Sequence, residues 1–155
     1  MTIAGDDPTP WGLLRDGQIV ALTQRGSTIV IDLELPRVRR RFPGGGSVVK
    51  VTLEGCTEFV FQPWDEPPID DPGGIVGSAP DLVGARVEPG VGALPAGMTV
   101  ECASGELRLR YRSLAVSLDD GTAVSLGELE GLAASDAAAW ALPGAGGPPG
   151  GSRPS

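Results

Sequence analysis

Apolar and polar residues alternate along several stretches of the chain, and a period of two residues predicts antiparallel β-strands. The clearest stretch is residues 28–35, where one face carries four apolar side chains: Ile29, Ile31, Leu33 and Leu35. Residues 18–25 form a second alternating stretch, and Arg25-Gly26 supplies a tight turn between the two. The pattern therefore predicts a β-hairpin over residues 16–35.

The alternation continues beyond this hairpin with interruptions. After Pro36 the apolar positions move to Val38 and Phe42, which predicts a bulge at the proline and a strand that carries on. Residues 47–62 alternate again, and Gly55 in their middle predicts a kink or a bulge within one element. Residues 98–118 alternate as well, with a change of parity near Arg112 that predicts another bulge.

Residues 63–97 lose this pattern because Pro, Gly and Asp are dense there, and we expect a long loop in which "DLVGARVE" forms a short strand or a turn. After a short strand "TAV", Ser125 and Glu128 match a capping box, and Leu126, Leu129 and Leu132 follow at helical spacing.

These elements predict an α+β fold, mainly an antiparallel β-meander sheet packed by one C-terminal amphipathic helix. The length of 155 residues favours one domain, which we place at residues 11–141. We expect a loose N-terminal arm over residues 1–10 and a disordered Gly/Pro-rich tail over residues 142–155.

The chain is acidic, with a net charge of −8, and this disfavours general binding of nucleic acids. The charge is uneven. Residues 37–50 hold five basic residues and no acidic one, so the rest of the chain, with seven basic and twenty acidic residues, carries −13. Long-range attraction is therefore expected toward basic partners.

The chain lacks the residues that most enzyme chemistries need. Histidine is absent, which removes the usual general base and the commonest zinc ligand. The stretch "FPGGGS" lacks the spacing of a phosphate-binding loop, and the acidic pairs do not match a calcium-binding loop. Cys56 and Cys102 are expected to be buried, reduced thiols. We expect no enzyme activity, no metal and no cofactor.

Neither a signal peptide nor a transmembrane stretch is visible, so the expected location is the cytoplasm, without membrane binding. The oligomeric state is left open.

Two groups of alternating arginines are the main candidate for a binding site. Arg37, Arg39 and Arg41 would project from one strand, and Arg108, Arg110 and Arg112 from another. If the two strands were neighbours, these six residues would form a surface for an anionic ligand or an acidic protein. The other interpretation is that acidic neighbours pair with the arginines on an ordinary solvated face. Separately, "WDEPPIDD" at residues 64–71 is either a set of solvated turns or an acidic loop that engages a basic partner.

The motifs "DGQI" in the first hairpin, "LEGC" at a strand end and "LRLRYRSLAVSL" before the helix resemble those of small uncharacterised bacterial α+β proteins. Some small acidic proteins of this class resemble immunity or antitoxin-like partners of secreted toxins. The resemblance implies stoichiometric binding of another protein and no catalysis, and it carries over no functional residue.

Overall fold

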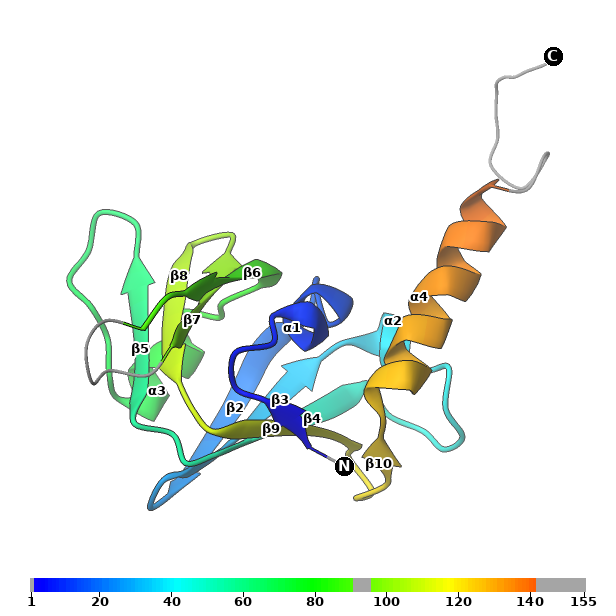
Figure 1. Ribbon diagram of the computed structural model, residues 1–155, viewed down its shortest axis with the longest axis horizontal. Helices are drawn as coiled ribbons and strands as arrows, with labels where there is room; N and C mark the ends of the chain where they lie inside the picture. Colours follow the sequence, from blue (N-terminus) through cyan, green and yellow to red (C-terminus); the bar gives the residue numbers. More distant parts are fainter. Residues whose placement is uncertain (1, 91–95, 142–155) are drawn as a thin grey trace, which may run out of the picture.

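The computed structural model describes residues 2–90 and 96–141, which are mostly antiparallel sheet with helices between strands (Figure 1). The strands are β1 (Ile3–Ala4), β2 (Gln18–Arg25), β3 (Thr28–Glu34), β4 (Val48–Glu54), β5 (Glu58–Pro63), β6 (Leu82–Glu88), β7 (Gly97–Cys102), β8 (Gly105–Arg110), β9 (Ser113–Leu118) and β10 (Ala123–Val124). The helices are α1 (Thr9–Leu13), α2 (Pro36–Arg39), α3 (Pro72–Gly77) and α4 (Leu126–Ala141). This combination agrees with the α+β class expected from the sequence.

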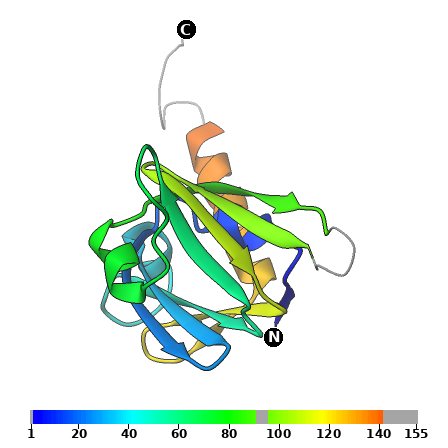
Figure 2. The same cartoon turned by 90° about the vertical axis from the view of Figure 1, so that its left-hand side faces the viewer.

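The strands form two antiparallel sheets, where the sequence predicted a single meander sheet (Figure 2). The first sheet has the order β1-β9-β4-β3-β2, with β10 beside β9, and the second has the order β5-β8-β7-β6. The predicted hairpin of β2 and β3 is confirmed, and Arg25 lies opposite Thr28 at its turn.

Two neighbouring strands cross from the first sheet to the second at the same place. β4 pairs with β9 in the first sheet, and their continuations β5 and β8 pair in the second. The N–H of Arg112 donates to Glu54 O and the N–H of Thr57 donates to Arg110 O, both at 2.8 Å, so the pairing persists through the bend. Gly55 has a φ of +65°, and an added Cβ would lie 3.0 Å from the Cβ of Arg112. The single element predicted around Gly55 is therefore wrong: the chain bends at this glycine and continues as a separate strand in the other sheet.

One hydrophobic core joins both sheets. The apolar faces predicted for β3, β4, β8 and β9 are buried, and Ile31, Val51 and Val116 of the first sheet belong to the same cluster as Phe61 and Leu107 of the second. In β2 the predicted face is wrong, because a register shift after Ile19 buries that residue and leaves Val20 39% exposed. Since strand side chains alternate between faces, the opposite face of each sheet is left for polar residues.

A second contact joins the free edges of the sheets. Ile19 at the start of β2 donates its N–H to Pro80 O at 3.0 Å, and the N–H of Leu82 in β6 donates to Gly17 O at 2.8 Å. The sheets are therefore held together both where the strands bend and at this opposite edge, which makes the second sheet a firm support for surface side chains.

The N-terminal residues pack against the sheets, so the expectation of a loose arm is wrong. Ile3 is 8% exposed and pairs with Leu114 of β9. The N–H of Gly5 donates to Arg112 O at 3.0 Å, and Pro10 is buried. The arm leads directly into Trp11, which is fully buried and donates from Nε1 to the hydroxyl of Tyr111 at 2.8 Å. Burial of these apolar side chains offsets the entropy cost of ordering the arm.

The long loop predicted at residues 63–97 contains two regular elements. The carboxylate of Asp71 accepts a hydrogen bond from the N–H of Gly74 at 2.7 Å and caps α3. Residues 82–88 form the edge strand β6, whose pairing with β7 shifts register between Leu82 and Gly84. This irregularity breaks the period of two, which is why the sequence pattern indicated at most a short strand.

The predicted capping box of α4 is confirmed. The N–H of Glu128 donates to Ser125 Oγ at 3.1 Å, and the N–H of Ser125 donates to Glu128 Oε1 at 2.9 Å. Leu129 is 2% exposed and belongs to the core, whereas the end of the helix points away from the sheets (Figure 1). That the helix covers a sheet face stays a prediction, and the disordered tail expected at residues 142–155 lies outside the described residues.

Within residues 2–90 and 96–141, no helix is long and apolar enough to cross a membrane.

Candidate functional site

The first group of predicted arginines lies on and after a helix, so the strand expected here is wrong. A proline opens α2, because its fixed φ suits the first helical position. The alternation expected for Arg37, Arg39 and Arg41 therefore does not occur. Arg37 donates to the backbone oxygen of Arg15 at 2.9 Å, and Arg41 donates to Ser135 Oγ at 3.2 Å. These side chains contact separate parts of the chain and do not share one face.

Arg39 is a structural residue and not a surface ligand. Its side chain is 2% exposed. Its Nε lies 3.0 Å from Asp119 Oδ1, and its Nη1 donates to the backbone oxygens of Phe42 and Pro43 at 3.4 and 3.1 Å. The residues that lead into the glycine triplet therefore fold around a buried guanidinium group.

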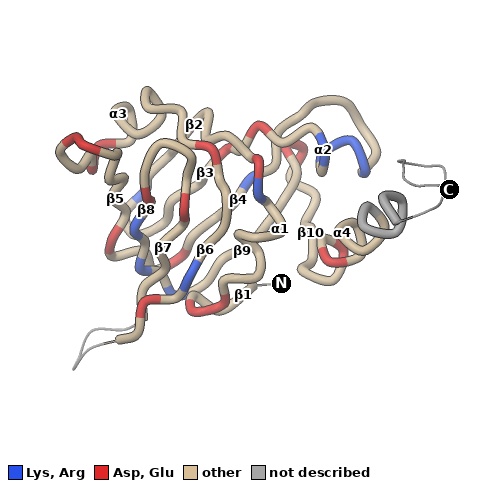
Figure 3. The backbone as a smooth tube through the Cα atoms, turned by 90° about the horizontal axis from the view of Figure 1, so that it is seen from above, with Lys and Arg blue, Asp and Glu red and all other residues tan. Residues whose placement is uncertain are grey.

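The second group of arginines lies in and beside the second sheet. Arg108 and Arg110 are on β8, and Arg112 lies between β8 and β9, where the strands change sheets. Helix α2 and strand β8 lie at opposite ends of the molecule (Figures 1 and 3). The structure therefore does not bring the six predicted arginines onto one surface.

The outer face of the second sheet carries a regular pattern of charged side chains. Arg86, Thr99 and Arg108 lie side by side on β6, β7 and β8. On one side of this row Glu101 lies opposite Glu106, and on the other side Arg110 lies opposite Glu58. We call this surface the charged face, and it consists of Glu58, Arg86, Glu88, Thr99, Glu101, Glu106, Arg108 and Arg110.

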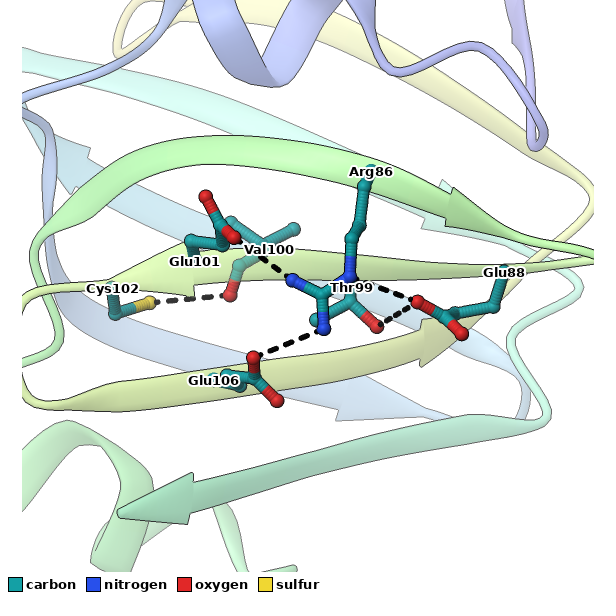
Figure 4. A network of polar contacts seen from close by, with 7 residues as sticks. All are labelled: Arg86, Glu88, Thr99, Val100, Glu101, Cys102 and Glu106. Atoms are coloured by element: carbon teal, nitrogen blue, oxygen red, sulfur yellow. Dashed lines mark hydrogen bonds and ion pairs between the residues drawn. The ribbon is translucent and has the colours of Figure 1, made fainter. Parts of the chain in front are cut away.

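Arg86 is the most connected residue of the charged face (Figure 4). Its Nε lies 3.1 Å from Glu88 Oε2, its Nη1 lies 2.9 Å from Glu101 Oε2, and its Nη2 lies 3.1 Å from Glu106 Oε2. These contacts, above all the hydrogen bond with Glu106, raise the pKa of Arg86 above its ordinary value. Three carboxylates from three strands thus hold one guanidinium group in a fixed position.

Arg108 lies between two engaged arginines. Arg110 donates from Nε to Glu58 Oε1 at 2.8 Å, and Arg86 is held as described. The side chain of Arg108 is exposed and makes no hydrogen bond or ion pair with the residues that the structure describes. A shallow depression of about 410 Å³ lies over this part of the face. The guanidinium group of Arg108 therefore has N–H donors on this face that can bind an acceptor of another molecule.

The charges around this depression are balanced. Its lining includes three arginines and three glutamates: Arg86, Arg108, Arg110, Glu58, Glu88 and Glu106. Such a surface has little net attraction for a small anion, since the field of each guanidinium group is opposed at short range. It offers instead an arrangement of positive and negative charges, to which a protein surface with the complementary arrangement can bind.

The two cysteines are free thiols, as the sequence predicted. Cys56 is half-buried beside a cavity of about 120 Å³ between β2, β5 and α3, and burial raises the pKa of its thiol. Burial also raises the pKa of Cys102, to about 12. Neither thiol is activated as a nucleophile, because the thiolate is the reactive form.

Sequence reasoning missed Arg86, Glu101 and Glu106. Arg86 lies in the stretch expected to be a loop, and Glu101 and Glu106 follow it by 15 and 20 residues, on two other strands. Alternation within "ARVE" was the available signal for an outward pair of Arg86 and Glu88, but only the pairing of strands shows that the four side chains meet.

Among the described residues, no three His, Cys, Asp or Glu side chains come together as metal ligands would.

No protein-family model, curated protein or solved structure matches this chain. The resemblance to immunity-like proteins therefore stays a prediction.

Proposed function

We propose that this chain is a non-catalytic protein-binding module of the immunity or antitoxin-like kind, and that the charged face is its binding surface. One observation carries the proposal: Arg108 is exposed and forms no hydrogen bond or ion pair with described residues, at the centre of a face whose other charges are paired. Fixed side chains lose little entropy on binding, so such a face is prepared for a complementary protein surface. The partner would place a carboxylate against Arg108 and basic groups near the flanking glutamates.

A cytoplasmic location fits this proposal, because both thiols are unpaired and the cytosol keeps thiols reduced. The raised pKa values of Cys56 and Cys102 also favour binding over covalent catalysis.

Charge reversal at Arg108 tests the proposal. Wild-type protein, Arg108→Glu and the control Arg25→Glu would serve as baits for a lysate of the source cell, since Arg25 is also exposed but lies at the β2–β3 turn. We expect a protein retained in stoichiometric amount by the wild type and the control and lost with Arg108→Glu. For the purified complex, the reversal should weaken binding by at least about tenfold. Absence of any protein with this pattern would contradict the proposal.

The second candidate function is binding of a small anionic ligand, favoured by the three arginines around the depression. Thermal unfolding in the presence of phosphate and citrate separates the two functions, because a ligand that binds only the native state raises the melting temperature. The balanced charges predict no rise. A rise that disappears in Arg108→Glu would favour the ligand-binding function instead.

A further inference from the structure

Trp64 is an exposed aromatic side chain at the end of β5, away from the centre of the charged face. It is 54% exposed, whereas Trp11, Phe61 and Tyr111 are buried in the core. Tryptophan is highly buried on average in folded proteins, and it is enriched among the residues that dominate binding energy at protein interfaces.

The position of Trp64 is fixed by the β7–β8 turn. Its backbone N–H donates to Ser104 O at 3.1 Å, and its indole Nε1 donates to Ala103 O at 3.2 Å. The loop that follows is closed by two backbone hydrogen bonds between Phe61 and Ile69, at 2.9 and 2.8 Å. The indole ring is therefore presented to solvent in one orientation, with its polar atom already satisfied.

The surroundings of Trp64 are acidic. Residues 51–85 contain seven acidic residues and no basic one. Asp65 and Glu66 directly follow Trp64 in the chain, are exposed, and form no ion pair with described residues. Asp81 comes from another segment, and its backbone oxygen accepts a hydrogen bond at 3.1 Å from the N–H of Ala103, the residue that anchors the indole. Figure 3 shows the acidic loop after β5 without a basic residue beside it.

We propose that Trp64 and the acidic residues beside it form a second protein-binding surface, whose partner is an exposed arginine-bearing segment. The ring face attracts a guanidinium group by cation–π interaction, and arginine stacks on aromatic rings better than lysine does. The carboxylates of Asp65 and Glu66 supply the acceptors for its N–H groups. This inference rests on the proposed function that the chain binds proteins, but it concerns a different surface from the charged face.

The test uses the full chain and three acetylated eight-residue peptides in which glycine alternates with arginine, lysine or glutamine. The probe is the indole N–H signal of Trp64 in a ¹H–¹⁵N spectrum, assigned by its loss in Trp64→Phe. We expect this signal to shift with the arginine peptide, less with the lysine peptide, and not with the glutamine peptide. Trp64→Ala should weaken binding of the arginine peptide about tenfold.

A pair of charge-matched variants separates local recognition from general attraction to an acidic protein. The double variant Asp65→Asn, Glu66→Gln should weaken binding of the arginine peptide several-fold. The control Asp6→Asn, Glu130→Gln changes the net charge equally at distant exposed sites and should not weaken this binding. The inference would be overturned if both double variants weakened peptide binding equally, or if the glutamine peptide shifted the Trp64 signal as much as the arginine peptide does. It would also be overturned if the signal shifted with protein concentration alone. The last outcome would mean that a second copy of the chain occupies this surface.

Failure of this inference can be told apart from failure of the proposed function. Arg108→Glu should leave binding of the arginine peptide unchanged, because the two surfaces use different side chains. If the wild-type protein failed to bind the arginine peptide but still retained a partner that Arg108→Glu loses, the Trp64 surface would be rejected and the charged face would stand.

Discussion

Replacing Arg39 by methionine should destabilise the protein, because the change removes the guanidinium group and keeps most of the aliphatic stem. Arg39 is 2% exposed and its Nε lies 3.0 Å from Asp119 Oδ1. Its Nη1 also donates to the backbone oxygens of Phe42 and Pro43. The substitution therefore leaves one carboxylate and two carbonyl groups without their donor.

The magnitude follows from the exposure of the groups left behind. Removing one partner of a buried ion pair costs about 3–5 kcal/mol of unfolding free energy. The side chain of Asp119 is 32% exposed, so water can replace part of the lost interaction. We therefore expect a loss of about 3 kcal/mol, at the lower end of that range. For a chain of this size, this corresponds to a fall in melting temperature of about 6–12 °C.

Urea denaturation followed by circular dichroism measures this loss, with Arg40→Met as the control. Arg40 is the next residue and is exposed, so its replacement should change the unfolding free energy by less than about 0.5 kcal/mol. A double-mutant cycle with Asp119→Asn should show coupling of about 1–3 kcal/mol, because the two side chains are in contact. A loss in Arg39→Met no larger than that in Arg40→Met would refute a structural role for this arginine.

Three further substitutions or titrations test other parts of the fold. Gly46 has a φ of +106°, and an added Cβ would overlap the Asp119 carboxylate, so Gly46→Ala should lower the unfolding free energy measured with urea by about 2 kcal/mol. The control Gly45→Ala has open space around the added Cβ and should be nearly neutral. Equal losses in the two variants would contradict this prediction. Leu129→Ala should cost about 3 kcal/mol in the same assay if the start of α4 is part of the core, and a loss below about 1 kcal/mol would argue against it. Burial raises the pKa of Tyr111, the single tyrosine, to about 12, above the value of about 10 expected in the unfolded chain. Its contribution to stability is therefore complete below pH 10 and is lost as the pH rises toward 12; absorbance at 295 nm in the folded protein should show no ionisation step at pH 10, and such a step would contradict the burial of this hydroxyl.

Local patterns in the sequence predicted the elements whose signals are short-range. The hairpin of β2 and β3 follows from alternation and a turn dipeptide, and the start of α4 follows from the capping residues Ser125 and Glu128. In each case the residues that decide the structure are neighbours in the chain. Helix α2 is the exception, because Pro36 fits both a strand end and the first position of a helix.

The arrangement of strands in two sheets could not be predicted in the same way. Alternation shows that one face of a strand is buried, but it does not show against which other strand it packs. Gly55 gave a visible signal, yet a kink within one sheet and a crossing between two sheets produce the same local pattern. The consequence for the candidate site is large, because the crossing separates Arg108 and Arg110 from the arginines of α2.

A regular row of arginines in the sequence is a poor guide to a site for the same physical reason. Whether an arginine is available depends on which carboxylates strand pairing brings beside it, and these come from distant parts of the chain. Arg39 meets Asp119, eighty residues later, and Arg110 meets Glu58, fifty-two residues earlier. Arg108 is left without such a partner among the described residues, and it has the same appearance in the sequence as its neighbours.

Both proposed surfaces depend on the hairpin of β7 and β8. Arg108 lies within β8, and its neighbour Thr99 in β7 lies opposite it. Trp64 directly follows β5, and the turn of the β7–β8 hairpin, at Ala103 and Ser104, accepts both of its hydrogen bonds. Because β7 and β8 are inner strands of the second sheet, they are bonded on both sides and resist local opening. The core residues of this hairpin therefore fix the distance between the two surfaces. A single partner that bound both surfaces would need contact groups at the same spacing.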